Sequence, residues 1–292
     1  MSGQPSVLVT LDGRVHDPGQ PLLFADDLAA VRGDGIFETL LVREGRACLL
    51  EAHLRRLASS AAMMDLPAPD PNAWRCAVDT AVAQWVGHTD REGALRLIYS
   101  RGRESGSPPT GYLTIAPLPD RVDAARRHGV AAVLLDRGLS STGIEAMPWL
   151  LAGAKTLSYA VNMAALRHGA ERGADDVVFV STDGFVLEGP RSTVVIAVEL
   201  DRRPCLLTPP PWYPILRGTT AGALFDAART AGFDCDYQAL RPADLFVAQG
   251  VWLVSSITLA ARVHTLDGRA MPPCHLAAQV QELVEAAILS DR

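Results

Sequence analysis

One side chain in this sequence has no chemical equivalent elsewhere in it: the 27 basic residues are 26 arginines and a single lysine, Lys155. Arginine keeps its proton near neutral pH, whereas a lysine in an apolar pocket can lose it and form a Schiff base with a carbonyl group. The small and apolar residues between Ala152 and Leu166 are a poor setting for a solvated charge. The composition therefore favours a reactive amine, and the alternative is a chance surface lysine.

The surroundings of Lys155 exclude several other uses of a lysine. A phosphate-binding P-loop needs glycine directly before the lysine, and an acylating Ser-x-x-Lys site needs serine three residues earlier. Lys155 has Ala154 and Ala152 at those positions. The sequence also contains no His-Glu-x-x-His, Cys-x-x-Cys or Gly-x-Ser-x-Gly, so we expect no metal site and no serine hydrolase.

A candidate partner for a Schiff-base cofactor is Glu188, which follows the apolar run Phe185-Val186-Leu187. A carboxylate among apolar neighbours needs a cation, and a protonated pyridine ring would be one. Schiff-base lysines often indicate pyridoxal phosphate, whose ring nitrogen needs such a partner. The alternative is an ordinary exposed carboxylate in a hairpin.

Two further segments could bind a phosphate group. Gly218-Thr219-Thr220 places backbone N–H groups and hydroxyls at the predicted start of a helix, where anions bind. Arg56, one helical turn after His53, could bind phosphate with two hydrogen bonds. The alternatives are simple helix capping at the first segment and a solvated helix face at the second.

The elements that position these residues begin with a part of the chain rich in antiparallel sheet. Hairpin signals such as Glu44-Gly45 separate its β-rich segments, and apolar residues at helical spacing follow them. Asn72 is expected to cap the second helix. The predicted elements are strands over 7–10, 36–42, 46–50, 94–100 and 112–117 and helices over 51–64 and 72–85.

A change to proline and charge between Pro117 and Arg127 predicts a linker. We place a smaller N-terminal α/β domain at 1–118, the linker at 119–127 and a larger C-terminal domain, which carries Lys155, at 128–292. There we expect a helix that bears Lys155 and strands and helices over 130–135, 177–180, 185–187, 194–198, 221–231, 251–255 and 275–289. This order predicts a two-domain α+β / α/β protein and not a dinucleotide-binding fold.

Composition limits the class of protein and its surroundings. The net charge is −6, which argues against a dedicated nucleic-acid or anionic-membrane binder. No apolar run approaches the roughly 18 residues of a membrane span. Residues 1–4 lack the features of a signal peptide, and the five cysteines are scattered, so we expect a soluble protein of the cytoplasm.

Five separated segments, one of them the sole lysine, resemble the class IV aminotransferase family, the fold-type IV pyridoxal-phosphate enzymes, in order and spacing. The resemblance covers nearly the whole chain. The segments are Arg32-Gly33-Asp34-Gly35-Ile36-Phe37-Glu38-Thr39, His53-Leu54-Arg55-Arg56-Leu57, Lys155, Asp183-Gly184-Phe185-Val186-Leu187-Glu188-Gly189 and Leu216-Arg217-Gly218-Thr219-Thr220.

The resemblance implies a two-domain fold like that of D-amino acid aminotransferases, with largely antiparallel sheets and packed helices. It also implies a homodimer that holds pyridoxal 5'-phosphate between the domains. Lys155 would be the catalytic residue and form the Schiff base, Glu188 would face the pyridine nitrogen, and Tyr159 would reach the phenolic oxygen. The residues implied for the phosphate are Arg56, Thr219, Thr220 and Ser256. Thr193 and Ala221 depart from the usual family pattern.

Within the family, the early motif and one loop favour aminodeoxychorismate lyases. D-amino acid aminotransferases of the best-known type have a tyrosine where Phe37 stands and an Arg-x-His pair that is missing from the loop after Ser100. The resemblance implies release of pyruvate from 4-amino-4-deoxychorismate to give 4-aminobenzoate for folate synthesis, with Phe37, Arg101 and Arg103 near the substrate. The alternatives are a D-amino acid or branched-chain aminotransferase, a dual activity, and a non-catalytic carrier of the cofactor or another ligand.

Overall fold

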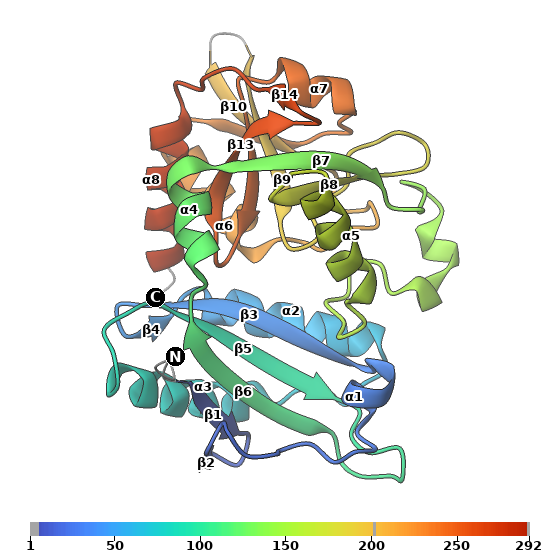
Figure 1. The fold of residues 1–292 in the computed structure, drawn as a ribbon, viewed down its shortest axis with the longest axis vertical. Coiled ribbons are helices and arrows are strands. Elements are labelled where there is room, and N and C mark those ends of the chain that lie inside the picture. Colours follow the sequence, from blue (N-terminus) through green and yellow to red (C-terminus); the bar gives the residue numbers. More distant parts are fainter. Residues whose placement is uncertain (1–5, 201–202, 291–292) are drawn as a thin grey trace. The chain divides into compact units, whose positions relative to one another are not determined.

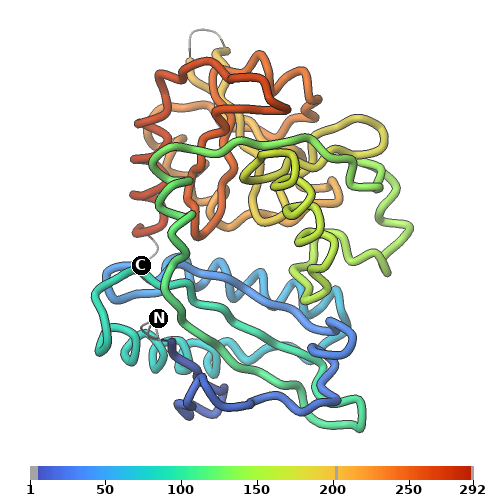
Figure 2. The backbone as a smooth tube through the Cα atoms, in the orientation of Figure 1, coloured from blue at the N-terminus to red at the C-terminus, as the bar shows by residue number. Residues whose placement is uncertain are grey.

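The computed structural model describes residues 6–200 and 203–290, which fold into two units (Figures 1 and 2). The first unit contains residues 6–119 and the short segment 154–159, which includes Lys155. The second unit contains 120–153 and the remaining described residues from 160 onward. Each unit is built on its own sheet.

The sheet of the first unit is antiparallel throughout, in the order β2-β1-β6-β5-β3-β4. Its longest strand, β3, pairs with β5 without interruption from Gly35 opposite Ser100 to Val42 opposite Gly93. The strands are β1 (Val7–Thr10), β2 (Val15–His16), β3 (Gly35–Arg43), β4 (Arg46–Ala47), β5 (Gly93–Ser100) and β6 (Thr110–Pro117).

Helix α2 packs on β3, and α3 packs on β1 and β6. The helices of this unit are α1 (Leu28–Arg32), α2 (Leu50–Met63) and α3 (Pro71–Val86). The predicted apolar stripe of α2 is confirmed, because Leu54, Leu57 and Ala61 are buried. The predicted cap at Asn72 is wrong. Asp70 caps the helix, because its carboxylate accepts from the Asn72 N–H. Pro71 occupies the first helical position, where the N–H that proline lacks would have no partner in the helix.

The segment with Lys155 is extended and runs along β3. Ile36 and Thr156 form an antiparallel bridge, and the Phe37 N–H donates to the Lys155 carbonyl at 3.0 Å. The predicted helix that bears Lys155 is therefore wrong, since these backbone groups pair with a strand far away in sequence. Helix α5 (Ala160–Glu171) begins five residues after Lys155. This pairing also groups Lys155 with the first unit, whereas the sequence placed it in the C-terminal domain.

The second unit contains an eight-stranded mixed sheet in the order β11-β10-β9-β12-β13-β7-β8, with β14 beside β13. Its centre, from β10 to β13, is antiparallel, while β7 pairs in parallel with both β8 and β13. The strands are β7 (Val130–Asp136), β8 (Asp176–Val180), β9 (Thr193–Leu200), β10 (Arg203–Thr208), β11 (Asp234–Tyr237), β12 (Gly250–Ser255), β13 (Leu259–Leu266) and β14 (Arg269–Ala270).

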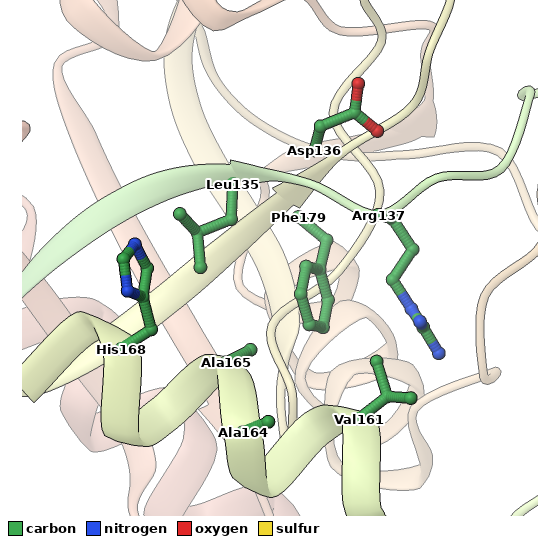
Figure 3. Close-up of a pocket in the computed structure, with 8 residues that line it drawn as sticks. All are labelled: Leu135, Asp136, Arg137, Val161, Ala164, Ala165, His168 and Phe179. Carbon is green, nitrogen blue, oxygen red and sulfur yellow. The ribbon is translucent and has the colours of Figure 1, made fainter.

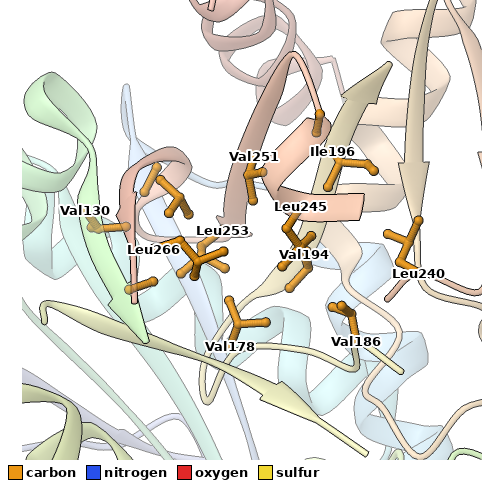
Figure 4. Packing of buried hydrophobic residues seen from close by; sticks show 14 of the residues in the cluster. Val130, Val178, Val186, Val194, Ile196, Leu240, Leu245, Val251, Leu253 and Leu266 are labelled. Atoms are coloured by element: carbon orange, nitrogen blue, oxygen red, sulfur yellow. The ribbon is translucent and has the colours of Figure 1, made fainter. Parts of the chain in front are cut away.

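The core of the second unit lies on this sheet. Val194, Leu245 and Leu253 meet in one buried cluster (Figure 4). All side chains from Val251 to Val254 are buried, as expected for a strand covered on both faces. The other helices are α4 (Asp120–His128), η1 (Ile144–Ala146), η2 (Pro148–Leu150), α6 (Thr219–Thr230), α7 (Pro242–Val247) and α8 (Ala277–Leu289).

Helix α4, from Asp120 to His128, replaces nearly all of the linker that the sequence predicted over 119–127. Val122 and Ala125 are buried, and the helix packs on β13. The segment therefore belongs to the second unit and is not an irregular connection. None of the helices in the described residues is long and apolar enough to cross a membrane.

Candidate functional site

The amine of Lys155 lies against two aromatic rings of the first unit. Its Nζ is 4.4 Å from the ring centroid of Phe37 and 5.7 Å from that of Tyr159. The two rings meet edge to face with centroids 5.3 Å apart. The backbone N–H of Lys155 donates to the buried hydroxyl of Ser60 at 3.1 Å, and this bond fixes the backbone beside the amine. Lys155, Phe37 and Tyr159, all predicted site residues, are thus brought together.

A buried charge cluster on β3 and α2 holds Arg56. Its Nε and Nη2 donate to the two carboxylate oxygens of Glu38 at 2.7 and 2.6 Å. Nδ1 of His53 lies 2.7 Å from Glu38 Oε2. The side chains of Glu38 and His53 are 0% and 1% exposed, and that of Arg56 is 13% exposed. This cluster orients a guanidinium that could bind an anion.

The charge states of the cluster follow from its contacts. Burial alone would raise the pKa of Glu38, but the charge and hydrogen bonds of Arg56, with the bond from His53, hold it well below its usual range. Burial lowers the pKa of His53 from its usual 6.5 even though Glu38 opposes this shift. We therefore treat His53 as neutral at pH 7, with its Nδ1–H donating to Glu38.

Glu38 is the residue of this cluster that the sequence reasoning missed. Along β3, Ile36, Glu38 and Leu40 share one face, and all three are 0% exposed. A carboxylate between two buried apolar residues at a spacing of two was the signal, because such a charge needs a cation. Its partner Arg56 was singled out only for phosphate.

In the second unit, Glu188 is fixed by the chain that leads into α6. Its Oε2 accepts from the Leu216 N–H at 3.0 Å, and its carbonyl accepts from the Phe179 N–H at 2.8 Å. The side chain is partly buried, after the buried Val186 and Leu187. Glu188 is therefore held beside edge strand β8 by the residue that lies just before Gly218-Thr219-Thr220, the segment predicted to bind phosphate.

The start of α6 forms an anion-binding arrangement. Gly218 is the N-cap, and Thr219 and Thr220 open the helix, where backbone N–H groups and the helix dipole favour negative charge. The hydroxyl of Thr220, a buried residue, lies 3.3 Å from that of Ser256. A Cβ on Gly218 would stand 2.2 Å from Thr193 Oγ1, so only glycine permits this close approach. The three predicted hydroxyls and the helix start thus lie in one unit with Glu188.

The spacing of these groups suits a ring that carries a phosphate arm. Leu216, whose N–H holds Glu188, and Thr219 are three positions apart in the chain, and such a stretch spans at most about 10 Å. A carboxylate for a ring nitrogen and N–H and O–H donors for a phosphate are therefore available within the reach of one small cofactor.

The two arginines proposed for substrate binding are engaged within the first unit. Arg101 donates to Asp34 at 2.7 Å and to the carbonyls of Met64 and Asp65 at the end of α2. Arg103 donates to Asp26 at 2.8 Å, and its guanidinium lies 4.2 Å from the ring centroid of Phe24. These contacts give Arg101 a structural role in joining α2 to the end of β5.

A pocket of about 380 Å³ lies between α5 and strands β7 and β8 (Figure 3). Val161, Ala165 and His168 line one side along α5, opposite Leu135 and Phe179. None of the predicted cofactor or substrate residues is among its lining residues. Over the described ranges, 6–200 and 203–290, no group of three His, Cys, Asp or Glu residues could hold a metal ion.

Known proteins resemble this chain over nearly its whole length. The family model for amino-transferase class IV matches residues 35–266. The bifunctional aminodeoxychorismate lyase / D-amino acid transaminase of Mycobacterium tuberculosis is 68% identical over 289 residues, which cover 98% of this chain and 100% of that protein.

Two solved structures of a hypothetical aminotransferase from Mycobacterium tuberculosis each have a TM-score of 0.95 and cover 98% of this chain and 100% of theirs. One, a PLP-bound form, is 69% identical, and the other, an α-ketoglutarate- and PMP-bound form, is 68% identical. This likeness confirms the predicted fold class, a two-domain α+β / α/β fold of fold-type IV.

Proposed function

Since the chain belongs to the amino-transferase class IV family, we propose that it is a pyridoxal 5'-phosphate enzyme with aminodeoxychorismate lyase and D-amino acid aminotransferase activities. The observation that carries the proposal is the position of the sole lysine, whose amine lies against Phe37 and Tyr159 in the unit that also holds Arg56. The named activities of the 68% identical relative support both reactions.

The residues present fit this cofactor. Lys155 is the only side chain able to form a Schiff base with its aldehyde. Glu188 offers a carboxylate to the ring nitrogen, and the start of α6 offers donors to the phosphate. The phosphate ligands of the proposal are Arg56 in the first unit and Thr219, Thr220 and Ser256 in the second.

When bound, pyridoxal phosphate supplies an electron sink for a carbanion at the substrate carbon that bears the amine. Lys155 would hold the cofactor and, after the substrate amine displaces it, its Nζ would accept the proton from that carbon. The rings of Phe37 and Tyr159, with centroids 4.4 and 5.7 Å from Nζ, restrict where the amine can move. Glu188 would keep a proton on the ring nitrogen.

The two proposed reactions share this proton abstraction and differ in the step after it. For the lyase, loss of enolpyruvate makes the ring of the product aromatic, so the elimination is strongly downhill. For the aminotransferase, Lys155 Nζ would return the proton to a different carbon, and hydrolysis would release a keto acid. Phe37 and Arg103 remain proposed substrate contacts, whereas the bonds of Arg101 to Asp34 and to two backbone carbonyls favour a structural role for it.

The experiment that tests this function uses two parallel reactions. One receives 4-amino-4-deoxychorismate and is assayed for 4-aminobenzoate; the other receives D-alanine with 2-oxoglutarate and is assayed for glutamate. We expect product in both with the wild type and in neither with Lys155→Arg, which keeps the charge but cannot form the Schiff base. Glutamate alone would leave only the aminotransferase, and product in neither reaction would refute the proposal.

We also propose that the enzyme is a homodimer in the cytoplasm. Met147, Trp149, Leu150, Val161 and Met163 expose large apolar side chains near one another in sequence, and Trp149 is 71% exposed. Large exposed apolar side chains gathered in one segment of a chain often mark a protein interface. Sedimentation equilibrium should give twice the chain mass of 31.2 kDa, whereas a single chain mass would contradict the dimer.

A further inference from the structure

Glu38 is a buried charge that the proposed reaction leaves unused. Its side chain is 0% exposed in the interior of β3. Removing a carboxylate from water costs several kcal/mol, and well-packed apolar residues can often replace a buried ion pair without loss of stability. Stability alone therefore does not explain why the chain places a charge here, and its partners are the place to look for a role.

Both oxygens of Glu38 are used to define the orientation of Arg56. The Nε and Nη2 of Arg56 bind separate oxygens at 2.7 and 2.6 Å, which is the bidentate geometry of a planar guanidinium. Two parallel hydrogen bonds fix the plane as well as the position of the group. The other edge of the guanidinium, with its Nη1, then points away from Glu38.

His53, on the same helix as Arg56, makes a further hydrogen bond with Glu38. It lies three residues before Arg56 on α2, so the two side chains emerge on one face of the helix. Its Nδ1 is 2.7 Å from the Glu38 oxygen that also accepts from Arg56 Nη2. Glu38 therefore ties one turn of α2 to β3 and leaves Arg56 few rotamers.

We propose that Glu38 is a positioning residue that fixes Arg56 for the phosphate of the cofactor, and that it thereby sets the preference of the protein for phosphorylated over non-phosphorylated pyridoxal. The inference rests on the proposed function, because it takes Arg56 as a phosphate ligand. Glu38 acts only through Arg56 and is assigned no contact with cofactor or substrate.

The test measures cofactor affinity rather than turnover. Protein freed of cofactor is titrated with pyridoxal 5'-phosphate and with pyridoxal. The ratio of the Kd for pyridoxal to the Kd for pyridoxal 5'-phosphate is then compared between wild type and Glu38→Gln. A hydrogen bond to a charged group contributes about 1.5–3 kcal/mol, so we expect the preference for the phosphate form to fall about 10- to 100-fold. A merely structural defect would weaken both ligands equally and leave the ratio unchanged.

Two variants control the measurement. Glu51→Gln removes the carboxylate of another bidentate pair in the same unit, with Arg75, and should leave the ratio at the wild-type value. Arg56→Ala should abolish most of the preference, and adding Glu38→Gln to it should cause no further loss. Further loss in the double variant would show that Glu38 does not act through Arg56.

The outcomes separate this inference from the proposed function. Wild-type protein that binds neither ligand would refute the function and the inference together. Wild-type protein that prefers the phosphate form, with an unchanged ratio in Glu38→Gln, would overturn the inference alone. Should Glu38→Gln fail to fold, Glu38→Asp decides by the same ratio: it keeps the charge but withdraws it by one methylene group, so a lower ratio supports the inference and an unchanged ratio overturns it.

Discussion

The carboxylate of Glu188 accepts a hydrogen bond from the N–H of Leu216 at 3.0 Å, two residues before Gly218 caps α6. One short stretch of chain therefore sets the spacing between the acid and the helix start. The pyridine nitrogen and the phosphate of the proposed cofactor are joined by a rigid ring, so their protein partners must keep a fixed spacing as well. A backbone hydrogen bond provides this without a further side chain.

Glu188→Gln should keep the fold and the cofactor but lose catalysis. The glutamine carbonyl oxygen can still accept from Leu216, whereas its neutral amide does not hold a proton on the ring nitrogen. We expect kcat for both reactions to fall about 10²- to 10³-fold, as for other lost electrostatic contacts. Steady-state assays at full cofactor occupancy measure this. A kcat within twofold of the wild type would exclude the assigned role.

Thr220→Val should weaken the cofactor phosphate site with little effect on the fold. The substitution keeps the shape of a buried side chain but removes the hydroxyl that lies 3.3 Å from Ser256. We expect the Kd for pyridoxal phosphate to rise about tenfold, the effect of one hydrogen bond. Thr230→Val, at the other end of α6, is the matched control and should leave the Kd unchanged. Equal effects in the two variants would argue against a phosphate site at the helix start.

Arg101→Gln distinguishes a structural arginine from a substrate ligand. Arg101 binds Asp34 and the carbonyls of Met64 and Asp65, so its loss leaves several acceptors without a charged donor. We expect the free energy of unfolding to fall by about 1–3 kcal/mol in urea denaturation, with KM little changed. A large rise in KM at unchanged stability would instead support the substrate role that the family resemblance implies.

Acid should weaken the contact between Asp183 and Ser141. The side-chain hydroxyl of Ser141, and its N–H, donate to Asp183 and lower the pKa of this carboxyl from 3.8 to about 2. Because the folded-state pKa lies below the unfolded one, the bonds stabilise the protein above about pH 4, and this contribution is lost as pH falls toward 2. Asp183→Asn should therefore lower Tm at pH 6, and the difference from the wild type should shrink between pH 4 and pH 2. A constant difference would contradict this assignment.

The sequence revealed side chains whose chemistry is evident from their type. A single lysine among arginines and the Gly-Thr-Thr start of α6 could be recognised without a fold. Glu38 could not be assigned in the same way, because its role depends on Arg56, which lies 18 residues later and meets it only when α2 packs on β3. Burial of a charge depends on tertiary contacts that one sequence does not display.

The two errors in the elements have different origins. The residues after Lys155 suit a helix, but the pairing of Thr156 with Ile36 holds the segment extended. Helix α4 was taken for a linker because of its charge, although both its acids lie in the first turn and three of its four bases in the last, as a helix dipole favours. That signal was present in the sequence, whereas the strand partner of Lys155 was not.

A bond between Lys155 and the cofactor aldehyde is the step on which the proposed chemistry most directly depends. The purified protein, loaded with pyridoxal phosphate and reduced with borohydride, is digested and its peptides are weighed by mass spectrometry. We predict a yellow protein that loses its colour on reduction and carries the cofactor mass on the peptide that contains Lys155, and a Lys155→Arg protein that shows neither. A wild-type protein that stays colourless with added cofactor, or that carries no added mass on this peptide, would contradict the central claim.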